Sequence, residues 1–248
     1  MINDAHWTDN LFGDLEPDNV QRRISQALQD MNDNARRAQG DANSRRKHTY
    51  GITRYNNSHE RLQEQFDGVE GAYRINAGKS FNWDLIVVGK ALLYPFHYAH
   101  QHKDVREAKI PNVHQGIVNL FQFAPPPTPI VDIFGDEHMP GYGPVEHGRL
   151  YGLPRDTRLV LVPFASNDSG LLKAYWGIAA LVDETGALEW TTTPEPLPVA
   201  SSTRPTLDIV QRHGAASEVV TFDSGDAPVA ELSPRPDEAG EAGGPTRP

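Results

Sequence analysis

Three histidines near the middle of the sequence are of a residue type that often binds metal ions. His97, His100 and His102 lie close together and are followed by Asp104. Imidazole and carboxylate groups are ligands for zinc, manganese and iron in proteins. Their spacing matches no recurrent metal-binding motif, and His97 also fits the alternation of a strand, in which a hydrogen-bonded histidine is common. We therefore favour a strand end with a polar loop, and keep a divalent-metal site as the alternative.

A second group of acids and histidines lies in a stretch rich in proline, glycine and acidic residues, over 124–157. Its members are Asp132, Asp136, Glu137, His138, Glu146 and His147. A loop of this length inside a domain is uncommon, and is usually either functional or disordered. Converging carboxylates and imidazoles would bind a divalent cation or act as an acid–base pair. The plain alternative is that these are polar residues of an exposed loop.

Asp84, Glu107 and Lys109 follow the residue order of a restriction-type nuclease core. In that chemistry an Asp and a Glu hold Mg²⁺ while a Lys activates the attacking water. The second carboxylate and the Lys should then lie on the strand that pairs with the Asp strand. We expect that paired strand over 91–98, which leaves Glu107 in the following loop. A metal-dependent hydrolase of the nuclease or phosphodiesterase type is therefore kept as an alternative function, with a divalent metal as its cofactor.

Cationic side chains gather between residues 36 and 54. They are Arg36, Arg37, Arg45, Arg46, Lys47 and Arg54, against Asp41 alone, which gives this stretch a net charge of +5. Tyr55 follows directly, and aromatic residues among arginines suit contact with nucleic acid or with an acidic protein surface. The region 36–61 is therefore the predicted binding surface. The plain alternative is a solvated helix face whose charge is balanced elsewhere.

The whole chain carries a net charge of -10, with 33 acidic and 23 basic residues. A uniformly acidic protein repels phosphate backbones, so contact with nucleic acid would depend on the local basic stretch. Residues 223–248 carry -4 of this charge and contain little that is apolar. We expect this tail to be disordered and to mask the basic stretch, an effect that salt would weaken.

The elements that position these residues begin with a helix. Residues 1–16 read as a lead-in whose Trp7, Leu11, Phe12 and Leu15 dock on a core. Pro17 suits a first helical turn, and the apolar residues that follow recur on one helical face over about 17–38. A second helix is expected to begin at Ser44 or Ser58 and to end before Gly68. A third, capped by Asn112, should place Val113, Ile117, Leu120 and Phe121 on one face.

The strand signals form two systems. Residues 83–88 and 91–98 predict a hairpin around Gly89-Lys90, with glycine first as a type II′ turn prefers. Pro95 lies in the second strand and indicates a sheet edge or a bulge. Residues 158–164, 171–182 and 187–192 predict a three-stranded antiparallel meander, because short turns cannot join parallel neighbours. The expected fold class is α+β, with N-terminal helices packed on a mainly antiparallel sheet.

We expect a single domain over 17–192, then a Pro-rich linker over 193–222 with a docking segment at 206–222. The absence of cysteine excludes disulfides, thiolate zinc sites and cysteine nucleophiles. The acidic first residues lack the basic start of a signal peptide, and no apolar run is long enough to span a bilayer. The expectation is a cytoplasmic protein without a membrane partner. No motif points to a family, and a non-catalytic binding or regulatory protein is the favoured function.

Overall fold

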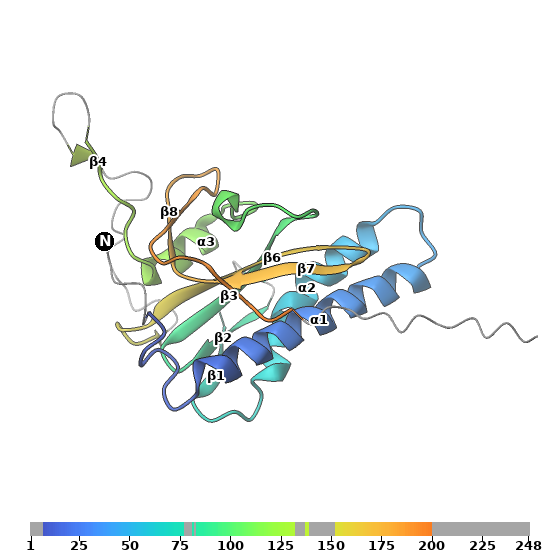
Figure 1. Cartoon of the computed structure of the whole chain (residues 1–248), viewed down its shortest axis with the longest axis horizontal. Helices are drawn as coiled ribbons and strands as arrows, with labels where there is room; N and C mark the ends of the chain where they lie inside the picture. Colours follow the sequence, from blue (N-terminus) through green and yellow to red (C-terminus); the bar gives the residue numbers. More distant parts are fainter. Residues whose placement is uncertain (1–6, 77–80, 82, 132–136, 139–151, 200–248) are drawn as a thin grey trace, which may run out of the picture. The chain divides into compact units, whose positions relative to one another are not determined.

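The computed structural model describes residues 7–76, 81, 83–131, 137–138 and 152–199. They belong to the first of two compact units of the chain, Met1–Ser202. Their fold is α+β, as predicted, with helices packed on a six-stranded, mostly antiparallel sheet (Figure 1). The predicted docking segment at 206–222 and the acidic tail at 223–248 lie outside the described residues.

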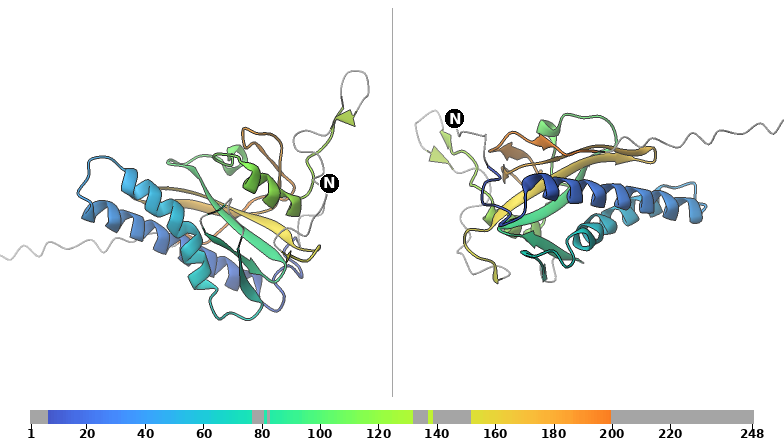
Figure 2. Two further views of the ribbon diagram at one scale, coloured as in Figure 1. Left: turned by 180° about the vertical axis from the view of Figure 1, so that it is seen from behind. Right: turned by 60° about the horizontal axis from the view of Figure 1, so that its bottom comes forward.

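Two long helices, α1 (Pro17–Asp41) and α2 (His48–Gln65), form an antiparallel hairpin on one face of the sheet (Figure 2). Pro17 stands at the start of α1, where its missing N–H costs no helical hydrogen bond. The apolar face predicted from the periodicity is fully buried, and its members are Val20, Ile24, Leu28, Met31 and Ala35. Burying each of the larger side chains contributes about 1.5–3 kcal/mol. Helix α2 begins between the two predicted starts.

The main sheet has the strand order β1-β2-β3-β6-β7-β10. Its strands are β1 (Ala72–Asn76), β2 (Asp84–Val88), β3 (Ala91–Ala99), β6 (Arg158–Asn167), β7 (Gly170–Trp176) and β10 (Glu195–Pro196). The predicted hairpin is β2–β3. Its turn has a positive φ of 60° at Gly89 and none at Lys90, the pattern of a type II′ turn.

Strand β3 has different neighbours along its length. It pairs antiparallel with β2 only as far as Leu93, which lies opposite Ile86. It pairs parallel with β6 from Ala91 to Ala99. Pro95 therefore lies where β3 has lost its β2 neighbour, in agreement with the predicted edge position. A parallel pair requires a long crossover, and the chain between β3 and β6 supplies it.

The predicted three-stranded meander was wrong in its second strand. Residues 171–182 form two strands, β7 and then β8 (Ala179–Leu181), which pairs with β9 (Leu188–Trp190) in a separate two-stranded sheet. The break falls at Gly177, where a Cβ would lie 3.1 Å from the ring of Trp190. The continuous apolar run concealed a bend at a glycine, where a larger residue would crowd the Trp190 ring. Strand β10 takes the place beside β7, so the sheet extends beyond the boundary expected at residue 192.

The segment between β3 and β6 carries the smaller elements. They are the 3₁₀ helices η3 (Val105–Glu107) and η4 (Phe121–Phe123), helix α3 (Gln115–Leu120), and the strands β4 (Ile130–Val131) and β5 (Glu137–His138), which pair with each other. Asn112 does not cap α3, because the helix begins only at Gln115; Asn112 itself has a left-handed φ of 53°. His114 is the cap, and its Nδ1 accepts a hydrogen bond from the Gly116 N–H at 3.1 Å.

Each face of the sheet has its own hydrophobic core. On the face covered by α1 and α2, the inward residues of the sheet include Leu93, Val160 and Val162. On the opposite face, Leu92 and Leu161 pack with the α3 region. Figure 2 shows the two helix layers on opposite sides of the strands. Among the described helices, none combines the length and the apolar character needed to cross a bilayer.

The lead-in docks on the first core, as predicted. Leu11 and Phe12 are buried, and the ring of Phe12 stacks on Trp176 with centroids 5.3 Å apart. The carboxylate of Glu195, in β10, accepts hydrogen bonds from the indole N–H groups of Trp7 at 2.7 Å and of Trp176 at 3.0 Å. One carboxylate thus joins the lead-in, β7 and β10.

Candidate functional site

The tip of the helical hairpin holds most of the predicted cationic residues. We define the tip as Arg36, Arg37 and the segment Arg45–Lys47, which lie at the end of α1 and in the connection to α2. Gln39 fixes the connection by donating to the carbonyl oxygens of Ser44 at 2.7 Å and Arg46 at 3.1 Å. Its side-chain oxygen also accepts from the backbone N–H of Tyr50 at 3.0 Å. The local backbone therefore presents the cationic side chains from a braced loop.

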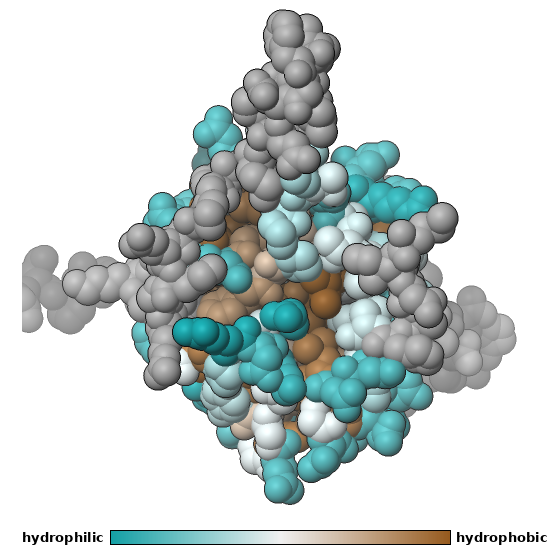
Figure 3. All heavy atoms as spheres, turned by 90° about the vertical axis from the view of Figure 1, so that its left-hand side faces the viewer, coloured by the Kyte–Doolittle hydropathy of each residue, from teal (hydrophilic) through white to brown (hydrophobic). Residues whose placement is uncertain are grey.

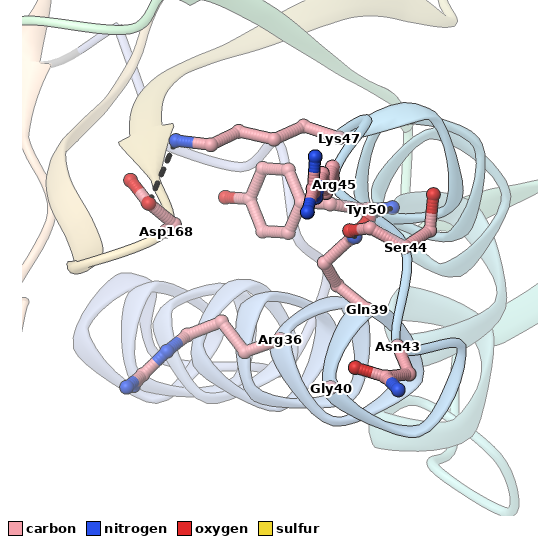
Figure 4. Close-up of a pocket in the computed structure, with 9 residues that line it drawn as sticks. All are labelled: Arg36, Gln39, Gly40, Asn43, Ser44, Arg45, Lys47, Tyr50 and Asp168. Carbon is pink, nitrogen blue, oxygen red and sulfur yellow. Dashed lines mark hydrogen bonds and ion pairs between the residues drawn. The ribbon is translucent and has the colours of Figure 1, made fainter.

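A hollow of about 440 Å³ opens beside the tip (Figure 4). Arg36, Arg45 and Lys47 line it together with Asp168, which belongs to the turn between β6 and β7. Nζ of Lys47 lies 2.7 Å from the Asp168 carboxylate. The pKa of Asp168 is lowered below its usual range, chiefly by this hydrogen bond. The sequence predicts only a short turn between the strands 158–164 and 171–182, so it did not predict this contact between distant segments.

The charges at the tip are only partly compensated. Besides the Lys47–Asp168 pair, Arg36 lies 3.7 Å from the carboxylate of Asp33. Arg45 and Arg46 are exposed and form no ion pair within the part of the chain that the structure describes. The tip therefore keeps a local positive charge in a protein whose net charge is -10.

Tyr50 anchors the tip to the sheet. It is buried, its hydroxyl donates to the carbonyl oxygen of Asn167 at 2.8 Å, and it lies 2.8 Å from the side-chain oxygen of Asn32. A satisfied buried hydroxyl of this kind favours one position of α2 against the β6–β7 turn. Figure 4 shows Tyr50 between the two helices and that turn. Tyr50 lies in the predicted basic region, but nothing in its sequence position indicates this anchoring role.

Two residues of the predicted binding surface lie further along α2. Arg54 packs with its guanidinium carbon 5.3 Å from the centre of the Tyr50 ring. It also lines a second, smaller cavity of about 230 Å³, between α2 and the end of β3. Tyr55 is 51% exposed and has its ring edge-on to Trp83, with centroids 4.5 Å apart. The structure thus places Arg54 and Tyr55 within α2, beyond the hairpin tip.

The three histidines are brought together only in part. The rings of His97 and His100 lie 4.5 Å apart at the end of β3, and His97 hydrogen-bonds through Nε2 to the carbonyl oxygen of Ser166 at 3.2 Å. Burial, then the charge of Arg54, lowers the pKa of His97 to about 3, so the ring is neutral near neutral pH. His102 is exposed. Among the described residues, no three His, Asp or Glu side chains are grouped as a metal ion would require.

Asp84, Glu107 and Lys109 have separate neighbours. The Asp84 carboxylate accepts from the side-chain amide of Asn76 at 3.0 Å at the start of β2. Glu107 pairs with Lys103 at 3.3 Å in η3, and the backbone of Lys109 bridges to Ala187. No contact joins the three in the described part of the chain, so the hydrolase interpretation gains no support from them.

The acidic loop is described only in part. Asp132, Asp136, Glu146 and His147 lie outside the described residues. Glu137 and His138 form the backbone of β5, paired with β4. The metal-binding and acid–base interpretations of this loop therefore remain predictions from the sequence.

A group of rings between α2 and the sheet had no signal in the sequence. His59 is 3% exposed and stacks on Trp83, with centroids 4.2 Å apart and an interplanar angle of 18°. Its ring centroid also lies 5.8 Å from that of Tyr94, in β3. Burial lowers the pKa of His59 to about 3. The contact joins α2 to the sheet where β2 and β3 part.

The end of the molecule opposite the hairpin tip has a different surface. Figure 3 shows hydrophobic residues there in a strip between hydrophilic side chains. The tip thus presents incompletely paired cations beside a hollow that Asp168 also lines, which makes it the candidate site for an acidic partner. Comparisons of this chain with protein-family models, with curated protein sequences and with solved structures found no match.

Proposed function

We propose that this protein is a binding protein whose hairpin tip contacts an acidic segment of another protein. The observation that carries the proposal is the pair Arg45 and Arg46, two adjacent exposed arginines without an ion-pair partner in the described chain. Exposed uncompensated cations attract an acidic partner and accelerate the encounter with it. Arginine also offers a planar fork of donors that matches a carboxylate.

The neighbouring surface of α2 favours a protein over a nucleic acid. Ile52 is 48% and Tyr55 51% exposed, and their spacing of three residues puts them on the same side of the helix. Exposed apolar residues close to cations suit a segment that mixes acids with hydrophobic side chains. A nucleic acid would need aromatic faces for stacking beside the cations. Tyr50 is buried, and Tyr55, although exposed, packs edge-on against Trp83. The excess of negative charge elsewhere would also repel a long polyanion.

The test uses a double variant, Arg45→Gln with Arg46→Gln, and a labelled peptide of alternating Glu and Leu. Fluorescence anisotropy at low salt measures its affinity for the full chain. If each exposed charge contributes about 0.2–1 kcal/mol to binding, the double variant should bind the peptide about 2- to 30-fold more weakly. The affinity of the unaltered protein should also fall as salt is added, because salt screens exposed charges.

The matched control removes two arginines from the other end of the molecule. Arg155 and Arg158 are exposed near the start of β6, and Asp168 follows the end of the same strand, about 30 Å away at 3.3 Å per residue. The variant Arg155→Gln with Arg158→Gln should bind the peptide as the unaltered protein does. An equal loss of affinity in both double variants would mean that binding depends only on the net charge of the protein, and it would contradict the proposal.

A second arm separates the two kinds of partner. Ile52→Ser should weaken binding of the peptide and leave binding of a single-stranded oligonucleotide unchanged. If the oligonucleotide bound more tightly than the peptide, and Ile52→Ser affected neither, the acidic-protein proposal would be overturned in favour of nucleic acid.

A further inference from the structure

A second cavity lies where α2, the end of β3 and the segment before α3 meet. Its volume is about 230 Å³, and residues from all three segments line it. It opens beside the part of β3 that has lost its β2 neighbour after Leu93. Its walls are largely apolar and aromatic, and include Tyr94, Phe96 and Phe164. A concave, mostly apolar cavity with a few polar groups is the usual form of a small-molecule site.

Among the described residues, Arg54 is the one cation that lines this cavity, and no acid lines it. Arg54 forms no ion pair within the described residues, and its Nη1 is buried without a hydrogen-bond partner. Burial lowers the pKa of Arg54 from its usual value, although a guanidinium keeps its proton at all ordinary pH values. Leaving a buried donor unsatisfied is unfavourable, and more so for a charged group. Because Arg54 lines the cavity, an anion there would meet its uncompensated charge.

The remaining polar groups restrict the charge of the ligand. His97 lines the cavity and is neutral near neutral pH, and its Nε2 is already engaged with the carbonyl oxygen of Ser166. His114 also lines the cavity, and because its Nδ1 accepts from the Gly116 N–H, its ring proton lies on Nε2. That Nε2–H is a donor with no partner found among the described residues. The cavity thus offers one guanidinium, the His114 Nε2–H and other polar side chains that include Ser58 and Asn112.

We propose that this cavity binds a small aromatic monocarboxylate, with its carboxylate on Arg54 and its ring against Tyr94, Phe96 and Phe164. The single cation matches one carboxylate, and guanidinium and carboxylate form paired hydrogen bonds. Aromatic walls also attract cations, but the charge of Arg54 opposes a cationic ligand. Arg54 takes no part in the proposed contact with a protein, whereas Tyr55 lines this cavity and also belongs to the exposed surface of α2.

The test titrates the full chain with 4-fluorobenzoate and with its neutral isostere 4-fluorobenzamide, followed by fluorine NMR at neutral pH. A charge-assisted hydrogen bond predicts that the benzoate binds about 10-fold or more tightly than the benzamide. Arg54→Gln should abolish this preference, and Arg54→Lys should restore part of it, since it keeps the charge. Circular dichroism and thermal melting show whether each variant is folded.

Arg61→Gln is the matched control, because Arg61 is a cation on the same helix that pairs with Glu64 and does not line the cavity. It should keep the preference for the benzoate. The proposal is overturned if the unaltered protein binds neither probe, if it binds both equally, or if folded Arg54→Gln keeps the preference. Loss of the preference in Arg61→Gln as well would also overturn it.

Discussion

His59 is a histidine whose folded environment excludes its charged form. Burial lowers its pKa from an ordinary value of 6.5 to about 3. As the pH falls below the ordinary pKa, the unfolded chain takes up a proton that the folded chain cannot, so the free energy of unfolding decreases. This contribution is fully present above about pH 6.5 and is lost towards about pH 3. The same sign holds for His97, whose pKa is also lowered to about 3.

We expect His59 alone to lower the free energy of unfolding by about 2 kcal/mol between about pH 7 and about pH 5. His59→Phe keeps a ring stacked on Trp83 and removes the titrating group, so its decrease over this range should be smaller by that amount. Urea denaturation at the two pH values measures the decrease in the unaltered protein and in His59→Phe. His102→Ala, at an exposed histidine, should leave the decrease unchanged, and a decrease in His59→Phe equal to that of the unaltered protein would contradict the assignment.

At the scale of single elements, the β2–β3 turn depends on a glycine. Gly89 has a φ of 60°, and a Cβ there would lie 2.6 Å from the backbone carbon of Phe12 and 2.7 Å from the carbonyl oxygen of Leu11. The lead-in packs directly on the turn, and the Lys90 N–H donates to that same Leu11 oxygen at 2.7 Å. The turn is thus constrained by its own conformation and by its neighbour.

Gly89→Ala should lower the free energy of unfolding by about 3 kcal/mol or more, since the left-handed conformation and the backbone clash both oppose the methyl group. The matched variant is Gly51→Ala, inside α2, where a Cβ would meet nothing within 4 Å. There the free energy of unfolding should rise by about 0.5–1 kcal/mol. Urea denaturation measures both changes, and a Gly89→Ala protein as stable as the unaltered one would show that the lead-in does not hold the turn.

The elements also show how far the sequence predicts this fold. The spacing of Val20, Ile24 and Leu28 predicted α1, and Gly89-Lys90 predicted the hairpin, because both signals are local. The pairing of Lys47 with Asp168 and the inward position of Arg54 had no local signal. They arise from segments far apart in the chain, which one sequence does not relate. The bend at Gly177 was missed because an apolar run does not reveal where a strand turns away.

At the scale of the whole molecule, Glu195 connects distant parts of the chain. Its carboxylate accepts from Trp7 and from Trp176, so three segments share one acceptor group. A glutamine at this position has a single carbonyl oxygen, which would leave one indole N–H without a good acceptor. The contact therefore provides a direct test of whether the lead-in belongs to the cooperative fold.

Glu195→Gln should lower the free energy of unfolding by about 1–3 kcal/mol, the cost of an unsatisfied donor. In a Trp7→Phe background that indole N–H is absent, so the same substitution should cost less, with a coupling energy of at least about 0.5 kcal/mol. Urea denaturation of the four proteins in this double-mutant cycle measures the coupling. Strictly additive effects would mean that Trp7 and Glu195 do not interact in solution.

The parallel pairing of β3 with β6 has a consequence for how the chain reaches its fold. Ala91 pairs with Arg158, so the centre of the sheet closes a loop of more than 60 residues. Such a closure is entropically unfavourable until its contacts form, whereas the α1–α2 and β2–β3 hairpins close short loops. The hairpins should therefore form before the centre of the sheet. Because closure entropy grows only with the logarithm of length, doubling this crossover would cost about 0.6 kcal/mol, so the centre of this sheet tolerates large changes in crossover length.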